Sequence, residues 1–404
     1  MTLGIDAARH TVGAVAHLAR YHAATTARGL AELSRAPRAL PLSSPVDAAG
    51  QALRWWGTML DRRVPHWHLR HRTVMRTPFA HLLDFSDGST DGSTDGSTDR
   101  LVPTLVLPPQ AGHSSTVVDF SPAQSQVKVI REAGLTRVSV LDWRPATRAT
   151  RHITITDYLD VIDRSVELMG GRVNLVGNCQ GGWLAAIYAA LHPDRVHTLI
   201  LAGAPIDFHA GDSVIASTTK ALHGLLGMVP YRALVALNGG LMSGRAALAN
   251  FIHIQPQSEI GRQLDLLHHL DDTEHVERYR VFEDWFKHTQ DIPGAFYLWL
   301  VENLFVHNKL ISGDLIVEGR RADLANVTCP LFLLAGAADH ITPPAQLFAA
   351  ADAVGTPPEN VTVRLAAGGH LGLFMGRNAL RDDWPVLMSA VHDLSAGERL
   401  PLVG

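Results

Sequence analysis

The sequence predicts an α/β fold, in which a mostly parallel β-sheet carries helices on both faces and a helical cap is inserted into the chain. Short apolar runs of strand length alternate with helical patterns before residue 204 and again after residue 316. Residues 172–192 join one such strand to a helix through a turn in which a cysteine stands among glycines. Residues 205–315 break the alternation, because they show helical periodicity, several aromatic side chains and few strand signals.

The expected elements follow from these patterns and from their glycine and proline boundaries. Residues 71–85 are typical of a strand interrupted at Pro78, and Thr156 or Asp157 can cap a helix that ends at Gly170-Gly171. Further strands are expected at residues 101–107, 137–141, 172–176, 197–202, 329–336 and 361–365. Further helices are expected at residues 5–35, 53–60, 127–133, 183–191 and 383–394.

Four segments are predicted along the chain. A helical region at 1–70 precedes the first part of an α/β core at 71–204, a helical cap occupies 205–315, and the second part of the core follows at 316–404. The repeat DGSTDGSTDGSTD at 87–99 has no apolar side chain to bury, so we expect a flexible loop there. Its acidic residues lack the spacing of an EF-hand loop, which argues against a calcium site.

Composition narrows the class of protein. The chain has 404 residues, of which 46% are hydrophobic and 18% charged, and this is typical of a globular protein. A net charge of −4 does not indicate the basic surface that is typical of nucleic-acid-binding proteins. We expect no transmembrane segment, because no uninterrupted apolar run reaches about 18 residues. The first residues lack a basic start followed by an apolar stretch, which argues against a secretory signal and favours the cytoplasm.

The cysteine and histidine patterns predict neither disulfides nor metal. There are two cysteines, Cys179 and Cys329, which is too few for a disulfide framework. Cys329 opens an apolar strand and is interpreted as structural. The 22 histidines are mostly scattered, and no H-E-x-x-H motif or paired Cys/His spacing indicates zinc.

The turn at residues 177–182, Gly-Asn-Cys-Gln-Gly-Gly, has the context of a nucleophile elbow between a strand and a helix. Cys179 stands where most hydrolases carry serine. The positive end of the following helix favours the thiolate form of Cys179, and the Gln180 amide points where an oxyanion would form. Topology places a second amide donor in the loop after the strand at 101–107, near Gln110 or Ala111. The alternative interpretation is a buried cysteine in a glycine-rich turn.

A thiol nucleophile needs a base, and the base needs an orienting acid. The sequence supplies them in the order nucleophile, acid, histidine, each after a strand: Asp339 lies in GAADHITPP and His370 in AGGHLG. We therefore predict that Cys179 attacks an acyl carbonyl, that His370 handles the proton and that Asp339 orients His370. Asp207 could be the acid instead.

Two other histidines are weighed against these roles. His340, beside Asp339, could be a second proton-handling group, although adjacent side chains normally point in different directions. His113 lies in the loop that follows Pro108-Pro109, and a structural role is the better interpretation for it.

Together these motifs resemble the poly(3-hydroxyalkanoate) synthases, especially the short catalytic subunits of the two-subunit class. The resemblance runs from about residue 70 to the end and includes the cysteine box GNCQGG. Its other marks, in chain order, are VVDFSPAQSQVKVIREAGL with VLDW, LHPDRVHTLI with APIDF, EDWFKHTQDIPGAFYLWLVENLFVHNKLISGDL, ADLANVTCPLFLLAGAADHITPP and GGHLGLF.

The resemblance implies an α/β-hydrolase fold and a Cys179–His370–Asp339 triad that polymerises 3-hydroxyacyl-CoA and releases coenzyme A. It implies no cofactor beyond that thioester substrate. A growing polyester chain and a second synthase subunit or a homodimer would be the partners, and the location would be the cytoplasm or a polyester granule surface.

Two departures from the family pattern lead to alternative hypotheses on function. The DGST repeat is unusual for the family, and PPQAGHSS at 108–115 is closer to intracellular depolymerases and related hydrolases. The alternatives are therefore a depolymerase or acyl-CoA thioesterase that uses the same three residues, and a non-catalytic granule-associated protein. An intact set of Cys179, Asp339 and His370 argues against the last, because a scaffold needs none of them.

Overall fold

The computed structural model describes residues 23–24, 26–27, 45–86, 101–254 and 256–397. The helix expected at 5–35 falls almost entirely outside these residues, and the DGST repeat lies wholly outside them.

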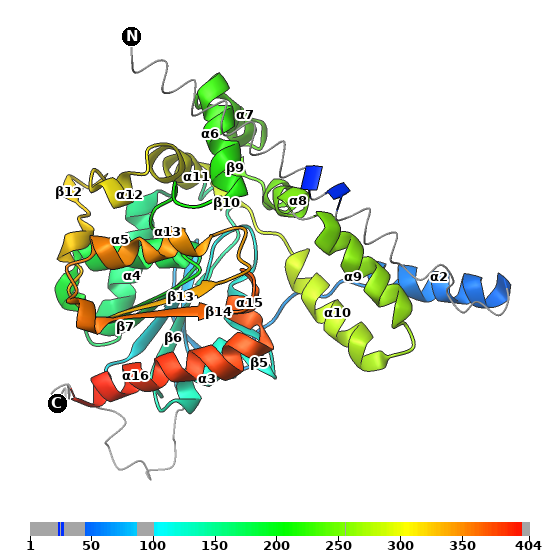
Figure 1. Ribbon diagram of the computed structural model, residues 1–404, viewed down its shortest axis with the longest axis horizontal. Coiled ribbons are helices and arrows are strands. Elements are labelled where there is room, and N and C mark those ends of the chain that lie inside the picture. Colours follow the sequence, from blue (N-terminus) through cyan, green and yellow to red (C-terminus); the bar gives the residue numbers. More distant parts are fainter. Residues whose placement is uncertain (1–22, 25, 28–44, 87–100, 255, 398–404) are drawn as a thin grey trace.

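An eight-stranded sheet forms the centre of the fold (Figure 1). The second strand is antiparallel to both of its neighbours, and the remaining neighbouring strands pair in parallel. In spatial order the strands are β1 (Arg72–Arg76), β2 (Ala80–Asp84), β6 (Val138–Trp143), β3 (Thr104–Leu107), β7 (Val173–Asn178), β8 (Val196–Ala202), β13 (Leu331–Gly336) and β14 (Val361–Ala366).

Helices cover both faces of this sheet, which confirms the predicted architecture. Successive strand residues alternate between two apolar cores: Leu175 packs in one and Val176 in the other. The Leu175 core includes helices α4 (Ile155–Leu168), α5 (Gln180–Leu191), α13 (Pro344–Phe348) and α14 (Ala350–Ala353). The Val176 core includes α3 (Gln126–Glu132), α15 (Gly372–Met375) and α16 (Trp384–Gly397). A short hairpin, β4 (Asp119–Ser121) and β5 (Gln124–Ser125), precedes α3.

The start of α4 corrects one prediction. Neither Thr156 nor Asp157 is the N-cap, because the helix already begins at Ile155 after the cap Thr154. Asp157 instead completes a capping box, in which its carboxylate accepts a hydrogen bond from the Thr154 backbone N–H at 2.7 Å.

Between β8 and β13 the chain leaves the sheet and forms mainly helices. We call residues 203–330 the insertion. Its elements are α6 (Val214–Leu226), α7 (Val229–Leu237), β9 (Leu241–Met242), α8 (Gly244–Ile254), α9 (Pro256–His268), α10 (Thr273–Phe286), β10 (Ile292–Pro293), α11 (Gly294–Leu300), a π-helical turn (Val301–Val306), α12 (Lys309–Ser312), β11 (Ile316–Val317), β12 (Arg320–Arg321) and a 3-10 turn (Leu324–Asn326).

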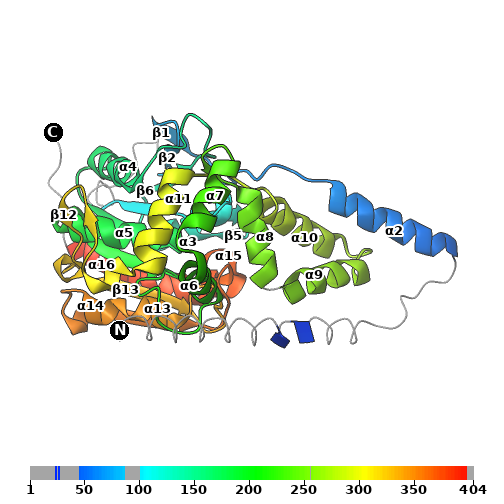
Figure 2. The same cartoon turned by 90° about the horizontal axis from the view of Figure 1, so that it is seen from above.

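Helix α2 (Pro45–Leu60) is longer than the predicted helix at 53–60, and it packs on the insertion instead of the sheet. Arg54 forms an ion pair with Asp271 at 3.1 Å, and the backbone N–H of Arg63 donates to Asp284 Oδ1 at 3.1 Å. Figures 1 and 2 show α2, α9 and α10 together on an arm that extends away from the sheet.

Candidate active site

Cys179 occupies the sharp turn between β7 and α5. Its φ of 50° and ψ of −115° lie in a backbone region that residues other than glycine rarely adopt. Its N–H donates to the Ala202 carbonyl at 2.8 Å. The strained turn is held at both ends by regular structure, as a nucleophile elbow requires.

Close packing explains the glycines around Cys179. A Cβ at Gly181 would lie far inside van der Waals contact with the Leu107 carbonyl, and one at Gly182 would overlap the Ala204 side chain. Gly181 and Gly182 belong to the first turn of α5, so the helix starts three residues earlier than the predicted 183–191. The glycines thus allow α5 to approach the ends of β3 and β8.

A reciprocal amide pair fixes the residue before the cysteine. Asn178 donates to Gln126 Oε1 at 2.6 Å, and Gln126 donates back to Asn178 Oδ1 at 3.3 Å. Both side chains are fully buried. This pair ties the end of β7 to the start of α3 underneath the turn.

His370 and Asp339 meet at the ends of β14 and β13. Their Nδ1 and Oδ2 atoms lie 2.7 Å apart, and both side chains are buried. The other carboxylate oxygen of Asp339 accepts the backbone N–H groups of Ile341 and Thr342, at 2.9 and 2.8 Å. Asp339 is therefore held in place from two sides, and His370 and Cys179 line the same cavity.

Burial lowers the pKa of His370, but the nearby Asp339 and Cys179 raise it by charge and by hydrogen bonding. The net result is a His370 pKa well above its usual range. This balance favours the imidazolium form of His370 beside the Asp339 carboxylate.

Asp207, the alternative acid, is engaged elsewhere. Its Oδ1 accepts hydrogen bonds from the His209 backbone N–H at 2.9 Å and from Asn308 Nδ2 at 2.7 Å. It therefore anchors a loop of the insertion, and Asp339 is the carboxylate that the structure brings to His370.

The two predicted oxyanion donors lie on the segments that the elbow brings together. Gln180 opens α5, and Gln110 lies in the loop after β3, where its side-chain oxygen accepts a hydrogen bond from the Tyr158 hydroxyl. Within the described part of the chain, the side-chain Nε2 groups of Gln110 and Gln180 are buried without a hydrogen-bond partner. Ala111, the neighbour of Gln110, lines the same cavity as Cys179.

A cavity of about 340 Å³ opens in front of Cys179 and His370. Its wall is largely apolar and combines core loops with the insertion. The residues on the core side include Pro109, Ala111, His113, His340, Ile341, Leu371 and Phe374. The residues from α8, α9 and α10 are Phe251, Ile252, Ile254, Ser258, Glu259, Arg262, Phe282, Trp285 and Phe286.

His113 joins the two sides of this cavity. Its ring stacks on Trp285 and Phe286, and its Nε2 lies 3.0 Å from the Phe286 carbonyl oxygen. Burial lowers the pKa of His113 to about 4, so the ring is neutral at physiological pH. A structural role for His113 agrees with this packing. His340 also lines the cavity.

A cluster of charged groups lies at the α9–α10 side of the cavity, where Glu259 and Arg262 line the wall. The Arg262 guanidinium lies 4.9 Å from the Phe282 ring centroid and pairs with Glu259 and Glu283. Lys287 Nζ lies 2.9 Å from Glu259 and 2.6 Å from the fully buried Glu283. Sequence reasoning did not find this cluster, because its members belong to two helices and follow no single spacing.

Strand order and elbow define the class of protein: an α/β-hydrolase fold with cysteine at the nucleophile position. Within that class, the chain belongs to the family described as "Protein of unknown function (DUF3141)", whose profile matches residues 88–392. This match covers most of the core and all of the insertion.

The chain is also similar to poly(3-hydroxyalkanoate) polymerases. It is 26% identical over 278 residues to "Poly(3-hydroxyalkanoate) polymerase subunit PhaC" of Allochromatium vinosum, covering 67% of this chain and 75% of that one. It is 28% identical over 284 residues to the protein of the same name from Haloferax mediterranei, covering 67% and 55%. A Rhizobium meliloti chain named "Uncharacterized protein in ackA 5'region" is 28% identical over 295 residues, covering 70% and 40%.

Among solved structures, a carboxylesterase of the thaumarchaeon Nitrososphaera gargenis superposes with a TM-score of 0.48 at 16% identity, covering 81% of this chain and 100% of that one. The strand order, and not this likeness, defines the fold. Among the described residues, no helix has the length and apolar character needed to cross a membrane.

Proposed function

We propose that this protein is an acyltransferase of the polyhydroxyalkanoate synthase type, which forms an acyl-enzyme on Cys179 from a 3-hydroxyacyl-CoA thioester. The observation that carries the proposal is the buried His370–Asp339 pair at 2.7 Å beside a cysteine in an elbow. The homology to PhaC polymerases supports the choice of substrate.

The chemistry follows from the three side chains. The Cys179 thiolate attacks the thioester carbonyl while His370 holds the proton taken from the thiol. The carbon–sulfur bond to coenzyme A then breaks, and the departing thiolate takes that proton. The 3-hydroxyl of the next unit gives its proton to His370 and attacks the acyl-Cys179 carbonyl, which releases the Cys179 thiolate. Amide donors on the Gln180 and Gln110 segments would stabilise each oxyanion.

The cavity suits this reaction because its aromatic and aliphatic wall offers an apolar surface to an acyl chain. In this proposal the insertion acts as the cap over the core and limits water at the acyl-enzyme, so that a hydroxyl acceptor competes well. The reaction needs no cofactor. A second synthase subunit or a second copy of this chain is the expected partner, and the cytoplasmic granule surface is the expected location.

Incubation of the purified protein with 3-hydroxybutyryl-CoA tests the proposal, with thiol release and turbidity followed together. We expect both signals in the parent and neither in Cys179→Ala. Thiol release with soluble hydroxy acid would overturn the polymerase function and indicate a thioesterase. If neither signal appears, even with longer 3-hydroxyacyl chains and after the proteins that co-purify with the chain are added back, the synthase proposal fails, and polymer degradation then distinguishes a depolymerase from a scaffold.

A further inference from the structure

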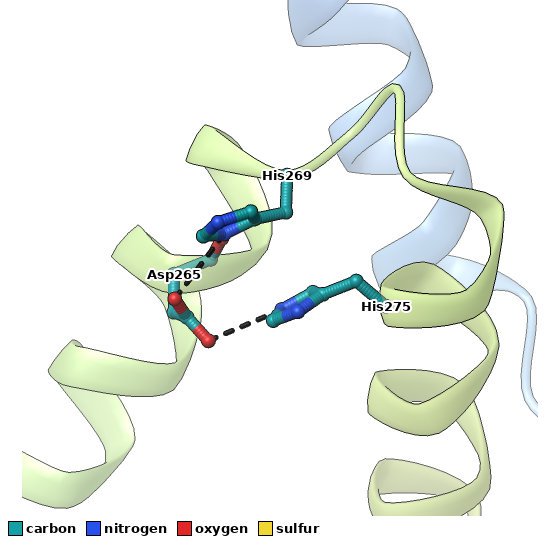
Figure 3. Close-up of side chains that lie close together, drawn as sticks. All are labelled: Asp265, His269 and His275. Carbon is teal, nitrogen blue, oxygen red and sulfur yellow. Dashed lines mark hydrogen bonds and ion pairs between the residues drawn. The ribbon is translucent and has the colours of Figure 1, made fainter.

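Away from the cavity, three side chains that commonly bind metals meet where α9 passes into α10 (Figure 3). We propose that Asp265, His269 and His275 form a binding site for a divalent transition-metal ion, Zn²⁺ in the first instance, which joins the two helices. The proposal concerns a part of the molecule that the proposed acyl transfer does not use.

The geometry brings one carboxylate between two imidazoles. Asp265 Oδ2 lies 3.1 Å from His275 Nε2, and Asp265 Oδ1 lies 3.3 Å from His269 Nδ1. One ligand atom from each residue lies within 4.8 Å of the others. Tetrahedral zinc with bonds near 2.1 Å requires ligand separations of about 3.4 Å. Asp265 and His269 are exposed, so modest side-chain rotations can close the difference.

The other hydrogen bonds of these residues leave a nitrogen of each histidine for a metal. His269 Nδ1 lies 2.9 Å from the Asp265 backbone oxygen, so it can donate its proton there, and rotation of this exposed ring would bring its Nε2 to the ion. His275 Nε2 already faces Asp265, and a metal ion would replace the proton between them. The Nδ1 of His275 would then carry a proton, and Arg278, 3.4 Å away, would turn toward its ion-pair partner Glu274.

The backbone around the trio is held by the turn between the helices. Asp272 caps α10 by accepting the N–H groups of Glu274 and His275, each at 3.0 Å, and its own N–H donates to the His269 carbonyl at 3.0 Å. The ion pair of Asp271 with Arg54 of α2 secures the turn from the other side. The two histidine rings consequently stack with centroids 4.4 Å apart.

The donor set selects the class of ion. Two imidazoles and one carboxylate suit Zn²⁺ and its neighbours in the transition series, whereas Ca²⁺ and Mg²⁺ prefer sites built from oxygen. The exposure of Asp265 and His269 leaves room for water as a fourth ligand. No metal site was predicted here from the sequence, because the third ligand comes from a second helix after a turn.

Metal binding here would act on the cavity through the helices themselves. Helix α9 carries Arg262 and α10 carries Phe282, and both residues line the cavity in front of Cys179. An ion at the turn would fix the spacing of the two helices at one end of that wall. We therefore expect the ion to stabilise the α9–α10 hairpin. Once the site is saturated, the free energy of unfolding should rise in proportion to the logarithm of the metal concentration.

The test is calorimetric titration of Zn²⁺ into the metal-free full chain, purified without an affinity tag. We expect one saturable site per chain, and at least about tenfold weaker binding in Asp265→Asn and in the double variant His269→Ala/His275→Ala. Amide hydrogen exchange in α9 and α10 should slow on adding Zn²⁺ to the parent and remain unchanged in the double variant.

His268→Ala is the matched control, because His268 is exposed, lies beside His269 and is outside the trio. It should bind like the parent. Circular dichroism in chelator should show the same folded state in all variants, since the substituted side chains lie on the surface or partly exposed. Equal affinity in the parent and the double variant, or no saturable binding below about 0.1 mM Zn²⁺, would overturn the proposal.

Discussion

His370 holds its proton in a buried position because the effects of Asp339 and Cys179 on its pKa together outweigh the cost of burial. The folded protein therefore binds this proton more tightly than the unfolded chain, whose histidine pKa is near 6.5. The resulting stability is fully present below pH 6.5 and is lost as the pH rises through the higher pKa of the folded state. Asp339 supplies the larger of the two charge effects.

Replacing Asp339 by Asn should lower the His370 pKa and flatten this dependence. We expect the free energy of unfolding of Asp339→Asn to fall less steeply than that of the parent between pH 6.5 and 9, as measured by urea denaturation. Asp207→Asn is the control, because Asp207 bonds to His209 and Asn308, and it should keep the parental slope. Equal slopes in Asp339→Asn and the parent would contradict the assigned cause.

At the scale of single residues, much of the site was predicted from local sequence. Cys179, Asp339 and His370 were predicted from their order and from the glycines around them, and the structure brings Asp339 to His370 as expected. Arg262 and Phe282 were not predicted to face the cavity, since their place there depends on how the insertion folds back over the core. No local sequence pattern specifies how the insertion is placed over the core.

At the scale of elements, the contact of α5 with the end of β3 decides whether the elbow forms. Gly181 lies against the Leu107 carbonyl, which is backbone and cannot rotate away. A side chain there would push α5 from the sheet and move Cys179 with it. Gly261 of α9 is different, because no atom lies within 4 Å of the position where its Cβ would stand.

The paired substitutions Gly181→Ala and Gly261→Ala test this contrast. Gly181→Ala should destabilise the protein by about 3 kcal/mol through overpacking, whereas Gly261→Ala should stabilise it by roughly 0.5–1 kcal/mol by improving a helix interior. Chemical denaturation measures both. A Gly181→Ala protein as stable as the parent would show that α5 does not pack as described.

Element boundaries show what a sequence pattern can and cannot give. The apolar runs located the sheet strands to within a few residues. The central strands β3, β6, β7, β8 and β13 are buried on both faces, and such strands need nearly continuous apolar sequence. The predicted cap of α4, Thr156 or Asp157, was wrong by two or three residues, since all three side chains are good caps and only the contact of Asp157 with Thr154 distinguishes them. The helices of the insertion were predicted as a class without boundaries, because their apolar faces are shared among several partners.

At the scale of the whole molecule, a buried charge cluster connects the arm to the cavity. Glu283 of α10 is fully buried and lies within ion-pair distance of Arg62, Arg262 and Lys287. Burial lowers the pKa of Lys287, but hydrogen bonds to Glu283 and Glu259 and their charges raise it overall. Removing the negative charge of Glu283 would leave the positive charges of its three partners only partly neutralised.

We therefore expect Glu283→Gln to cost about 3 kcal/mol of stability and to loosen the cavity wall, as seen by faster amide exchange in α9 and α10. The control is Glu274→Gln, which removes an exposed ion pair with Arg278 on the same helix and should cost less than about 0.5 kcal/mol. Similar costs for the two variants would mean that the cluster does not hold the arm.

The central claim, that Cys179 carries the acyl group, is tested most directly by intact-protein mass spectrometry after brief mixing with a 3-hydroxyacyl-CoA. Cys329 is the natural control, because it is the only other cysteine and burial raises its pKa to about 11. We predict one added acyl mass in the parent and in Cys329→Ala, and none in Cys179→Ala. Acylation that persists in Cys179→Ala, or that is lost in Cys329→Ala alone, would contradict the account.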